Sequence, residues 1–473
     1  MVNFILNNQK IATNLSFEMK VLDFLRAQQN ITSTKAGCRT GSCGTCLILV
    51  GELVNDGISY QPLNSCLLPL AEVEGKHLVT VEGLNSPQLN PIQQAMVEEG
   101  AIQCGYCTPG MVIALTAFFL KSSSFAESQA TVALDGNLCR CTGYQGIKRA
   151  VTKLGQQFTL PKVGPIARLH WLVDQRILPT YFLEIPQRLQ QFSVPQNRFT
   201  HLPPNSTIVA GGTIPWHRDS SKSVVFLSQY QELAGIRIEA NRCYVGAMTT
   251  MEALKSSPAM QKLFPQMENY FAVLASTSIR HRATLGGNLV TASPTGDLSI
   301  FFLAVGASVV LNDGQTQRTL ALKEFFKSYK QLDKHENELV EALHFPLPTT
   351  QTYFNFERVC KHADSEIPSV NSALQIQVEN GLIQQVHLSA GGVAPIPLYL
   401  KNTVNYLTGK EIKLEVIREA GKIVQTEISP LSDVRGSSEY KRLLLRQLFY
   451  AHFITLFSEN TVPGVQSIAL LGD

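Results

Sequence analysis

The sequence predicts an α+β multidomain protein, and three observations lead to this prediction. With 473 residues the chain is too long for one hydrophobic core, so three or four domains are expected. Strand-like segments come first, helical segments follow, and mixed α/β segments fill the second half. Eight of the ten cysteines fall within the first 141 residues, in two groups of four with different spacing. We therefore expect two small metal-binding domains ahead of larger α/β units.

The first cysteine group lies in a strand-rich stretch, residues 1–84. Cys38, Cys43, Cys46 and Cys66 have the spacing of plant-type [2Fe–2S] ferredoxins. Three glycines in the loop would let the backbone wrap around a cluster and point its N–H groups at the sulfurs. The alternative is a disulfide-stapled or zinc-bound β domain. Zinc sites favour paired C-x2-C knuckles, so the asymmetric spacing favours an iron–sulfur cluster.

The second cysteine group lies in a helical stretch. Cys104 and Cys107 form a C-x-x-C pair, and Cys139 and Cys141 form a C-x-C pair. Close pairs suit thiolate ligation of a metal centre, because the two sulfurs of each pair can face it. A zinc-binding helical module is the alternative, although C-x-C is short for zinc. Apolar periodicity and Pro positions predict helices near 91–100, 109–120 and 147–158.

Composition and cysteine usage indicate an ordinary cytoplasmic protein. The chain is 44% hydrophobic and 16% charged, its N-terminus has no basic signal-peptide region, and the apolar run Met111–Leu120 is half a membrane span. In a reducing compartment the grouped cysteines are expected to bind metal, and Cys243 and Cys360 to be plain thiols. The formal charge of +3 falls to about −1 if two clusters bring about −2 each, so no nucleic-acid partner is expected.

Two Gly-Gly turns mark the second half of the chain. Thr207–Thr213 is predicted to be a strand running into the turn at Gly211-Gly212, and Ala283–Leu289 contains a second pair. Turns without side chains let backbone N–H groups reach a pyrophosphate, although each pair alone is more often a simple tight turn. Neither a G-x-G-x-x-G fingerprint nor a P-loop accompanies them, so a Rossmann site is not indicated.

A further α/β unit is predicted from about residue 350. Leu374, Ile376 and Val378 alternate with polar residues, and Asn380-Gly381 is typical of a β-hairpin turn. Two amphipathic helices, near 411–425 and 439–457, follow it.

Taken together, these motifs resemble the small subunits of bacterial xanthine dehydrogenases, in the molybdenum hydroxylase family. The resemblance covers nearly the whole chain. It rests on both cysteine groups and on the runs Val209–Thr213, Ile279–Asn288, Ala292–Asp297, Phe325–Tyr329 and Ser432–Ser437.

The resemblance implies a specific domain order. Residues 1–84 would be a β-grasp [2Fe–2S] ferredoxin domain and residues 85–160 a four-helix [2Fe–2S] domain. A linker at 161–185 would lead to a two-lobed α+β FAD-binding domain of the PCMH/vanillyl-alcohol-oxidase type at 186–348. A C-terminal α/β domain like that of the CO-dehydrogenase flavoprotein would occupy 349–473.

The resemblance also implies which residues bind cofactors. The eight grouped cysteines would hold two [2Fe–2S] clusters. The FAD pyrophosphate would be bound by Ile208, Val209, Ala210, Gly211, Gly212, Thr213, Ile214 and Pro215. A second phosphate loop would contain Thr284, Gly287 and Asn288, and Asp297 would bind the adenosine or ribitol part. Tyr329 lies where the family meets NAD, and Gln103 and Cys141 would approach the pterin of a partner subunit.

Three positions depart from the family pattern. Leu274 stands where several relatives stack an aromatic ring on FAD, so a van der Waals contact would replace stacking. Arg358 stands where many relatives have Lys near the flavin; it stays cationic but cannot deprotonate. His281 replaces a common Asn and is expected to be a loop residue.

The implied function is that of the electron-transfer subunit of an NAD⁺-dependent xanthine dehydrogenase. Hypoxanthine and xanthine would be oxidised to urate at a molybdopterin on a large partner subunit, in a heterodimer or an α2β2 heterotetramer, so this chain would hold no catalytic residue. Electrons would pass through the two clusters to FAD and NAD⁺. The alternatives are the same role for an aldehyde or N-heterocycle, a stand-alone NADH-dependent iron–sulfur flavoprotein reductase, and a structural iron–sulfur adaptor. Oxygen or a quinone could replace NAD⁺. No membrane association is expected.

Overall fold

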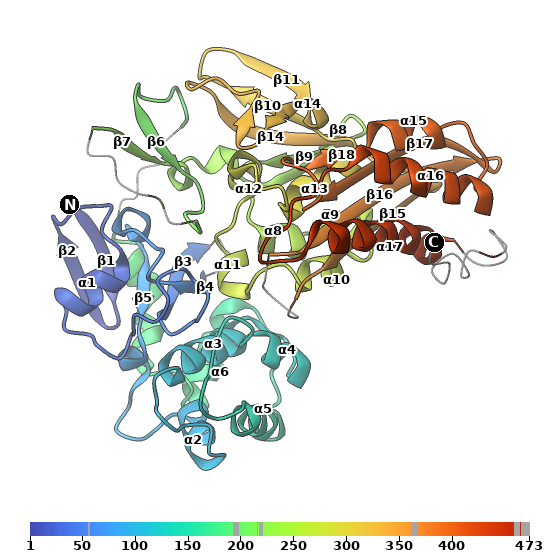
Figure 1. Ribbon diagram of the computed structural model, residues 1–473. Coiled ribbons are helices and arrows are strands. Elements are labelled where there is room, and N and C mark those ends of the chain that lie inside the picture. The colour runs from blue at the N-terminus through green and yellow to red at the C-terminus, as the bar shows by residue number, and fades with distance from the viewer. Residues whose placement is uncertain are drawn as a thin grey trace. The chain divides into compact units, whose positions relative to one another are not determined.

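The protein is represented by a computed structural model that describes residues 1–54, 57–192, 198–214, 216, 221–361, 367–457 and 464. The chain folds into two compact units (Figure 1). Unit 1 comprises Met1–Asn197, Gly212–Asp219 and Ser276–Arg282. Unit 2 comprises Arg198–Gly211, Ser220–Ala275 and Ala283–Asp473. Within the described ranges, no helix combines the length and apolar character that crossing a membrane requires.

Unit 1 begins with a five-stranded sheet of order β2-β1-β5-β3-β4, in which β1 and β5 are parallel and the other pairs antiparallel. Helix α1 packs on one face, where Phe4 meets Phe24 edge-on. This arrangement is the β-grasp fold, which confirms the expectation for the ferredoxin-type region. The elements are β1 (Val2–Leu6), β2 (Gln9–Thr13), α1 (Val21–Ala27), β3 (Leu47–Val54), β4 (Gly57–Asn64), η1 (Leu70–Val73), β5 (His77–Val79) and η2 (Val81–Leu84).

Strand β3 is apolar on both faces because both faces are covered. Ile48 and Val50 join the core beneath α1, whereas Leu47 and Leu49 join the core of the helical region that follows. Successive side chains of a strand point to opposite faces, so the continuous apolar run Leu47–Val50 is what a doubly covered strand requires.

The helical part of unit 1 surrounds the buried helix α3. Asn90 and Gln93 form a capping box at the start of α2, and a Pro lies in the first turn of both α2 and α3, as predicted. Helix α3 is buried on nearly all sides because α2, α6, β3 and β4 contact it. The helices are α2 (Pro91–Glu98), α3 (Thr108–Lys121), α4 (Glu127–Val132), α5 (Gln145–Gln157), α6 (Pro165–Asp174), η3 (Thr180–Glu184) and α7 (Ile185–Leu189).

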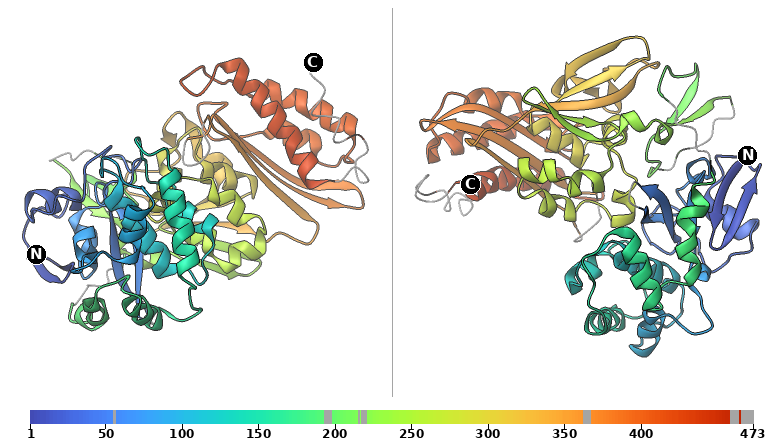
Figure 2. Two further views of the ribbon diagram at one scale, coloured as in Figure 1. Left: turned by 90° about the horizontal axis from the view of Figure 1, so that it is seen from below. Right: turned by 180° about the vertical axis from the view of Figure 1, so that it is seen from behind.

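The region 161–185, which we expected to form a linker, contains α6 and η3. Leu169, Leu172 and Phe182 are buried in the same core as α3. In Figure 2 the ribbon of this region is green and lies among the blue and teal elements of unit 1. Pro165 lies in the first turn of α6 and Pro179 directly precedes η3, so these two prolines start helices here instead of keeping the backbone extended.

The first part of unit 2 has two lobes. One lobe contains a parallel strand pair, β6 (Ser206–Val209) and β7 (Ser223–Phe226). The other is an antiparallel five-stranded sheet of order β11-β10-β14-β9-β8. The sheet consists of β8 (Ile236–Glu239), β9 (Arg242–Gly246), β10 (Ser308–Asn312), β11 (Gln317–Ala321) and β14 (Leu339–Pro346).

Short helices link the strands of these two lobes. They are η4 (Leu227–Gln229), η5 (Gln231–Leu233), α8 (Met251–Ser256), α9 (Pro258–Leu263), α10 (Met267–Ala272), α12 (Leu285–Thr291), α13 (Asp297–Ala304) and α14 (Leu322–Phe325). A two-stranded ribbon, β12 (Phe326–Ser328) and β13 (Gln331–Leu332), follows α14. One further helix, α11 (Thr277–Arg280), belongs to unit 1.

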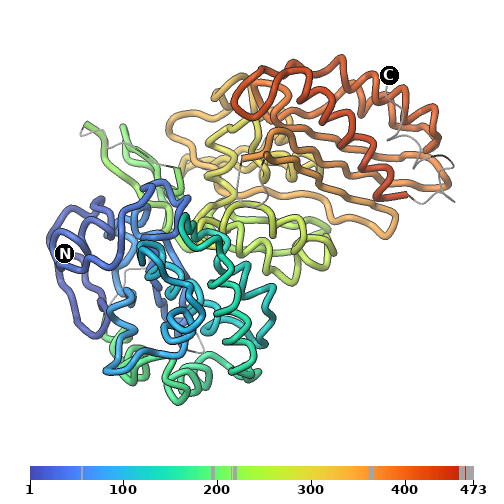
Figure 3. Tube along the Cα trace, turned by 60° about the horizontal axis from the view of Figure 1, so that its bottom comes forward, coloured from blue at the N-terminus to red at the C-terminus, as the bar shows by residue number. Residues whose placement is uncertain are grey.

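The C-terminal part of unit 2 is a four-stranded antiparallel sheet covered by helices (Figure 3). The predicted hairpin turn at Asn380-Gly381 is confirmed, with φ values of 51° and 77°. The first predicted helix begins at Leu414 because Glu411 pairs with Leu382 as a β-bridge. The elements are β15 (Thr352–Val359), β16 (Val370–Glu379), β17 (Leu382–Gly391), β18 (Leu398–Tyr399), α15 (Lys401–Leu407), α16 (Leu414–Glu427) and α17 (Ser438–Leu456).

Candidate cluster and flavin sites

The loop between α1 and β3 directs polar N–H groups at the sulfurs of the first cysteine group. The backbone N–H groups of Thr40 and Ser42 donate to Cys38 Sγ at 3.4 and 3.2 Å. The Asn64 side chain donates to Cys46 Sγ at 3.7 Å. These donors are the kind that stabilise thiolates around an iron–sulfur cluster.

Two glycines give the loop its close path around the sulfurs. Gly41 has φ +82°, in the left-handed region that favours glycine, and a Cβ there would lie 2.8 Å from Leu67, the residue after Cys66. A Cβ on Gly37 would lie 2.6 Å from Cys43 Sγ, which is too close for a side chain. The glycines that the sequence singled out therefore have a steric reason in this loop.

The four thiols of the first group are arranged as two pairs. Cys38 lies next to Cys43, and Cys46 next to Cys66. Interaction with the neighbouring Cys66 thiol lowers the pKa of Cys46 to about 6. Two adjacent pairs suit a cluster of two irons in which each iron takes two thiolates.

The second group is also arranged as two pairs. Cys104 Sγ lies 3.2 Å from Cys141 Sγ, and the Cys107 thiol is a neighbour of the Cys139 thiol. The first pair is exposed and the second is buried. Two pairs of thiols are an arrangement that a two-iron cluster can use, because each iron takes two thiolates.

The residues around the C-x-C pair hold it in place. Tyr144 has φ +65°, and its hydroxyl accepts a hydrogen bond from the Cys139 N–H at 2.9 Å. The Thr142 hydroxyl lies 3.0 Å from Cys139 Sγ. The Thr-Gly-Tyr sequence after Cys141 therefore folds back over the buried pair, which local spacing alone did not reveal.

The two cysteine groups lie in one unit and are joined by direct hydrogen bonds. The Leu138 N–H donates to the Cys43 carbonyl at 3.1 Å, and the Asn137 side chain donates to the Gly44 carbonyl at 3.2 Å. Gly110 approaches the same carbonyl so closely that a Cβ would lie 2.1 Å from it. A single hydrogen bond thus links Cys43, of the first cysteine group, to Leu138, the residue before Cys139 of the second group.

The first Gly-Gly loop offers backbone donors. Within the described residues, the N–H groups of Gly211, Gly212 and Thr213 have no hydrogen-bond partner, and Gly212 has φ +60°. Such a turn can bind a phosphate through its N–H groups, so the residues present fit the FAD pyrophosphate. Ile208 and Val209 lie in β6, Ile214 is exposed, and Pro215 lies outside the described residues.

The second Gly-Gly loop is organised by its own side chains. Thr284 caps α12 by accepting from the Gly287 N–H at 3.1 Å, and Asn288 accepts from the Ser299 N–H at 3.1 Å. A Cβ on Gly287 would lie 3.6 Å from Ala210, so within unit 2 the second loop lies beside the residue that precedes Gly211. The polar groups of Thr284 and Asn288 shape this loop.

A buried polar cluster surrounds Asp297 at the start of α13. Arg358 Nη2 lies 3.5 Å from its carboxylate, and the Asn371 side chain donates to it at 2.7 Å. Burial raises the pKa of Asp297, and the Arg358 charge opposes that rise. Arg358 also donates to the carbonyl of Val273, the neighbour of buried Leu274, so three positions predicted from the family resemblance meet here.

Asn371 is a member of this cluster that the sequence analysis missed. It lies opposite Arg358 in the β15–β16 register, so the sheet positions both side chains toward Asp297. Asn371 is fully buried, but its strand also contains Ser372, Gln375 and Gln377, so nothing in the sequence distinguishes Asn371 from the other polar residues of β16.

Tyr329 lies on the surface, in the turn between β12 and β13, with 62% of its area exposed. The next residue, Lys330, donates to the carbonyl of Thr291 at the end of α12. The turn that carries Tyr329 is therefore tied to the helix that begins at the second Gly-Gly loop. His281 follows α11 as a helix-terminal residue.

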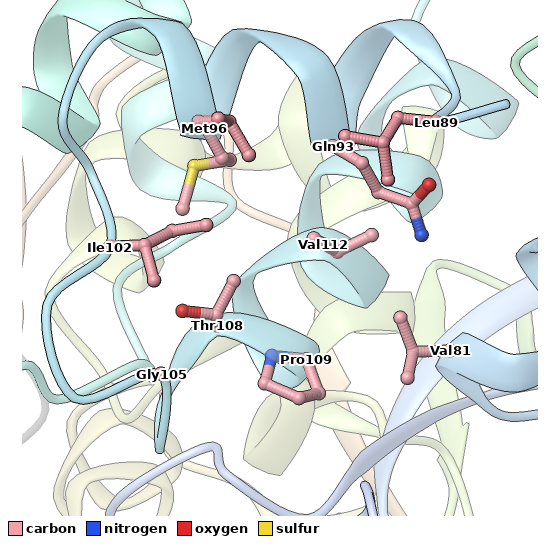
Figure 4. Close-up of a pocket in the computed structure, with 10 residues that line it drawn as sticks. Val81, Leu89, Gln93, Met96, Ile102, Gly105, Thr108, Pro109 and Val112 are labelled. Carbon is pink, nitrogen blue, oxygen red and sulfur yellow. The ribbon is translucent and has the colours of Figure 1, made fainter.

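An apolar pocket of about 280 Å³ lies beside the second cysteine group (Figure 4). Thr108 and Pro109, which follow Cys107, form part of its wall, together with Met96 and Ile102. Gln103, the residue after Ile102, is exposed, as are Cys104 and Cys141. This face combines exposed sulfur with apolar side chains, and the sequence analysis did not identify the pocket.

Comparisons with protein families identify four domains along the chain. Residues 4–70 match a 2Fe-2S iron-sulfur cluster binding domain and residues 80–152 a [2Fe-2S] binding domain. Residues 186–348 match the FAD binding domain in molybdopterin dehydrogenase. Residues 356–456 match the CO dehydrogenase flavoprotein C-terminal domain. The predicted fold class, with its two cluster domains and its flavin domains, is confirmed.

Similar proteins include oxidases and dehydrogenases. A xanthine dehydrogenase of Emericella nidulans is 25% identical and matches 97% of this chain, which spans 39% of that relative. Aldehyde oxidase 1 of Macaca fascicularis is also 25% identical, and the match covers 95% of this chain and 39% of that relative. A carbon monoxide dehydrogenase structure from Hydrogenophaga pseudoflava is 23% identical with a TM-score of 0.49, covering 54% of this chain and 96% of its own.

Proposed function

We propose that this chain is the iron–sulfur and FAD portion of a molybdenum hydroxylase and conducts electrons from a molybdopterin-bearing partner to NAD⁺. The matches of its four regions to two [2Fe-2S] domains, an FAD binding domain in molybdopterin dehydrogenase and a CO dehydrogenase flavoprotein C-terminal domain support this proposal. Bound [2Fe–2S] clusters carry single electrons, and bound FAD exchanges one or two. We propose Cys38, Cys43, Cys46 and Cys66 as ligands of one cluster. The ligands of the other would be Cys104, Cys107, Cys139 and Cys141.

The hydrogen bond from the Leu138 N–H to the Cys43 carbonyl is the observation that carries this proposal. It connects the backbone of one ligand to the residue next to another, so the two cysteine groups are held at a fixed separation. Burial of Cys107 and Cys139 places the inner pair of the second group away from water. The chain thus keeps both proposed cluster sites within unit 1.

The proposed direction starts at the second cysteine group. Cys104, Cys141 and the adjacent Gln103 are exposed, and the apolar pocket lies beside them. A partner with an apolar docking surface would cover this face and deliver electrons there. The flavin would be held by the first Gly-Gly loop, Thr284, Gly287, Asn288, Asp297, Leu274 and Arg358, and exposed Tyr329 would meet NAD⁺.

The substrate would be hypoxanthine or xanthine, oxidised to urate on the partner, in a heterodimer or an α2β2 heterotetramer in the cytoplasm. Aldehyde oxidases are as similar to the chain as xanthine dehydrogenases are, so an aldehyde or N-heterocycle is the second candidate. A stand-alone NADH-dependent reductase is a third candidate, and it would reduce dyes without any partner.

The variant Cys107→Ser tests the proposed order. We expect iron to fall from about four to about two per chain, while FAD is retained. Turnover from xanthine to NAD⁺ by the complex should stop, whereas NADH-to-dye activity should survive. The control Cys243→Ser changes a buried thiol outside both groups and should keep about four irons. Loss of both activities in Cys107→Ser, with FAD still bound, would contradict the order.

A further inference from the structure

One short segment crosses from the flavin-binding sequence into the cluster-binding unit. Ser276–Arg282 lies inside the region that matches the FAD binding domain, yet it belongs to unit 1. The residues on both sides of it, Ala275 and Ala283, belong to unit 2. Helix α11 forms most of the segment and contacts β4, as can be followed in Figure 1.

Two buried ion pairs hold this segment in unit 1. Arg282 Nη1 lies 2.6 Å from the carboxylate of Glu72, and both side chains are less than 10% exposed. Arg280, which is 1% exposed, lies 3.5 Å from Asp135. Asp135 also accepts hydrogen bonds from the N–H and hydroxyl of Thr277. The segment is therefore fixed to the β-grasp domain on one side and to the helical domain on the other.

Between these ion pairs, Ile279 packs on the first cysteine group. It contacts a small buried cluster that contains Cys46, Cys66 and Leu67. It also covers Gly41, where a Cβ would lie 2.6 Å from Ile279 Cδ1. The lack of a side chain at Gly41 is what gives Ile279 room to reach this place.

The edge of the site that Ile279 covers can influence the reduction potential of a bound cluster. A Cβ on Gly41 would also lie 2.8 Å from Leu67, the residue after Cys66, so Ile279 covers the backbone beside this ligand position. Hydrogen bonds to the sulfurs and access of water are two of the factors that set the reduction potential of an iron–sulfur cluster. A side chain that keeps water from this edge of the cluster site therefore acts on the potential without touching iron.

We propose that Ile279 is a positioning residue that seals the Cys46/Cys66 edge of the first cluster site and keeps its reduction potential low. A reduced [2Fe–2S] cluster carries one more negative charge than the oxidised cluster, and water stabilises the more highly charged form better. An apolar cover over this edge disfavours reduction. The two ion pairs hold Ile279 in place. Along the chain, the segment Ser276–Arg282 lies between Leu274 and Thr284, two of the residues proposed to contact FAD.

The proposal rests on the assignment of Cys38, Cys43, Cys46 and Cys66 as cluster ligands. The test compares Ile279→Val with Ile279→Thr in the full chain loaded with iron and FAD. Valine and threonine have the same shape, so only the polarity at the cover differs. The potentials of both clusters are measured by redox titration followed by electron paramagnetic resonance. The Cys107→Ser variant identifies the signal that belongs to the first cluster.

We expect Ile279→Val to keep the wild-type potential and Ile279→Thr to shift the first cluster to a more positive value. At the ambient potential where the wild type is half reduced, the ratio of reduced to oxidised cluster should rise by up to about tenfold, or 59 mV for a one-electron couple. The second cluster should keep its potential. Ile58→Ala is the control, because Ile58 is buried in the same domain but lies six residues, about 20 Å, along β4 from Asn64.

Equal potentials in Ile279→Val and Ile279→Thr would overturn the proposal, as would an equal shift in Ile58→Ala or in both clusters. If Ile279→Thr fails to load iron, Ile279→Ala replaces it in the comparison with Ile279→Val. Alanine removes most of the apolar side chain over the cluster site, so the same positive shift is expected. A wild-type chain that loads iron but lacks the first signal would instead refute the ligand assignment, which is a separate outcome.

Discussion

Protonation of His452 should weaken unit 2 in mild acid. His452 lies in α17 with no exposed surface, and Asn355 donates to its Nδ1 at 3.0 Å. Its Nε2–H donates to the Ser372 hydroxyl at 3.0 Å, because that hydroxyl already donates to the Ser389 carbonyl. Both ring nitrogens are therefore satisfied only in the neutral form, and burial lowers the pKa of His452 to about 3.

The size of the effect follows from the two pKa values. In the unfolded chain the imidazole has its ordinary pKa of about 6.5, so it takes up a proton below that pH while the folded form does not. The folded-state pKa lies below the unfolded value. The stability is therefore fully present above pH 6.5 and is lost as the pH falls toward 3. At pH 5 the loss is about 1.5 pH units at 1.36 kcal/mol each, or about 2 kcal/mol.

The assay is urea unfolding at pH 7 and pH 5, followed by pulsed hydrogen–deuterium exchange of peptides from β16 and α17. The variant His452→Gln should be less stable at pH 7, yet it should lose about 2 kcal/mol less than the wild type between the two pH values. The control His201→Gln changes an exposed histidine of unit 2 and should behave as the wild type. The same loss in the wild type and in His452→Gln would refute this reasoning.

Three further predictions concern the buried charges and the first Gly-Gly loop. Asp297→Ala leaves the Arg358 charge without its buried carboxylate and should cost unit 2 about 3–5 kcal/mol, read as a lower urea midpoint for β16 peptides. Gly212→Ala places a side chain at φ +60°, should cost about 1–2 kcal/mol, and should lower the FAD that stays bound through gel filtration. The control Gly164→Ala changes a glycine with φ −68° and no neighbouring atoms within 4 Å, and it should retain as much bound FAD as the wild type. Arg282→Met should lower the free energy of unfolding of unit 1 by about 3–5 kcal/mol, measured by tryptophan fluorescence in urea. The double variant Arg282→Met/Glu72→Met should recover much of that loss. No recovery would mean that the two side chains are not energetically coupled.

The cysteine pattern could be interpreted from sequence because ligand spacing is a local property. C-x4-C-x2-C and the C-x-C pair each place sulfurs within a few residues of one another, so spacing alone indicates their chemistry. The same holds for the Asn380-Gly381 turn and for the helices that start at Pro91 and near Pro109, whose signals lie within one turn of the chain.

The contacts that organise the sites could not be predicted in this way. Asn371 meets Asp297 across 74 residues, and Arg282 meets Glu72 across 210. Such pairs leave no periodic pattern, because each partner alone looks like an ordinary polar residue. The place of Ile279 beside Gly41 is likewise a consequence of tertiary folding, although its sequence belongs to the flavin-binding region.

The region 161–185 shows a different limit. Its prolines and glycine are typical of a linker, yet Leu169 and Leu172 are buried with α3. Proline in the first turn starts a helix as readily as it extends a chain, and only the apolar spacing after Pro165 distinguishes the two.

The most direct test of the account is the cofactor content of the purified chain. Iron, acid-labile sulfide, zinc and FAD would be measured on one preparation, together with the electron paramagnetic resonance spectrum after reduction. The account predicts about four irons, about four sulfides and one FAD per chain, with two distinct cluster signals. Stoichiometric zinc in place of iron, or a single cluster signal from a preparation with both cysteine groups intact, would contradict it.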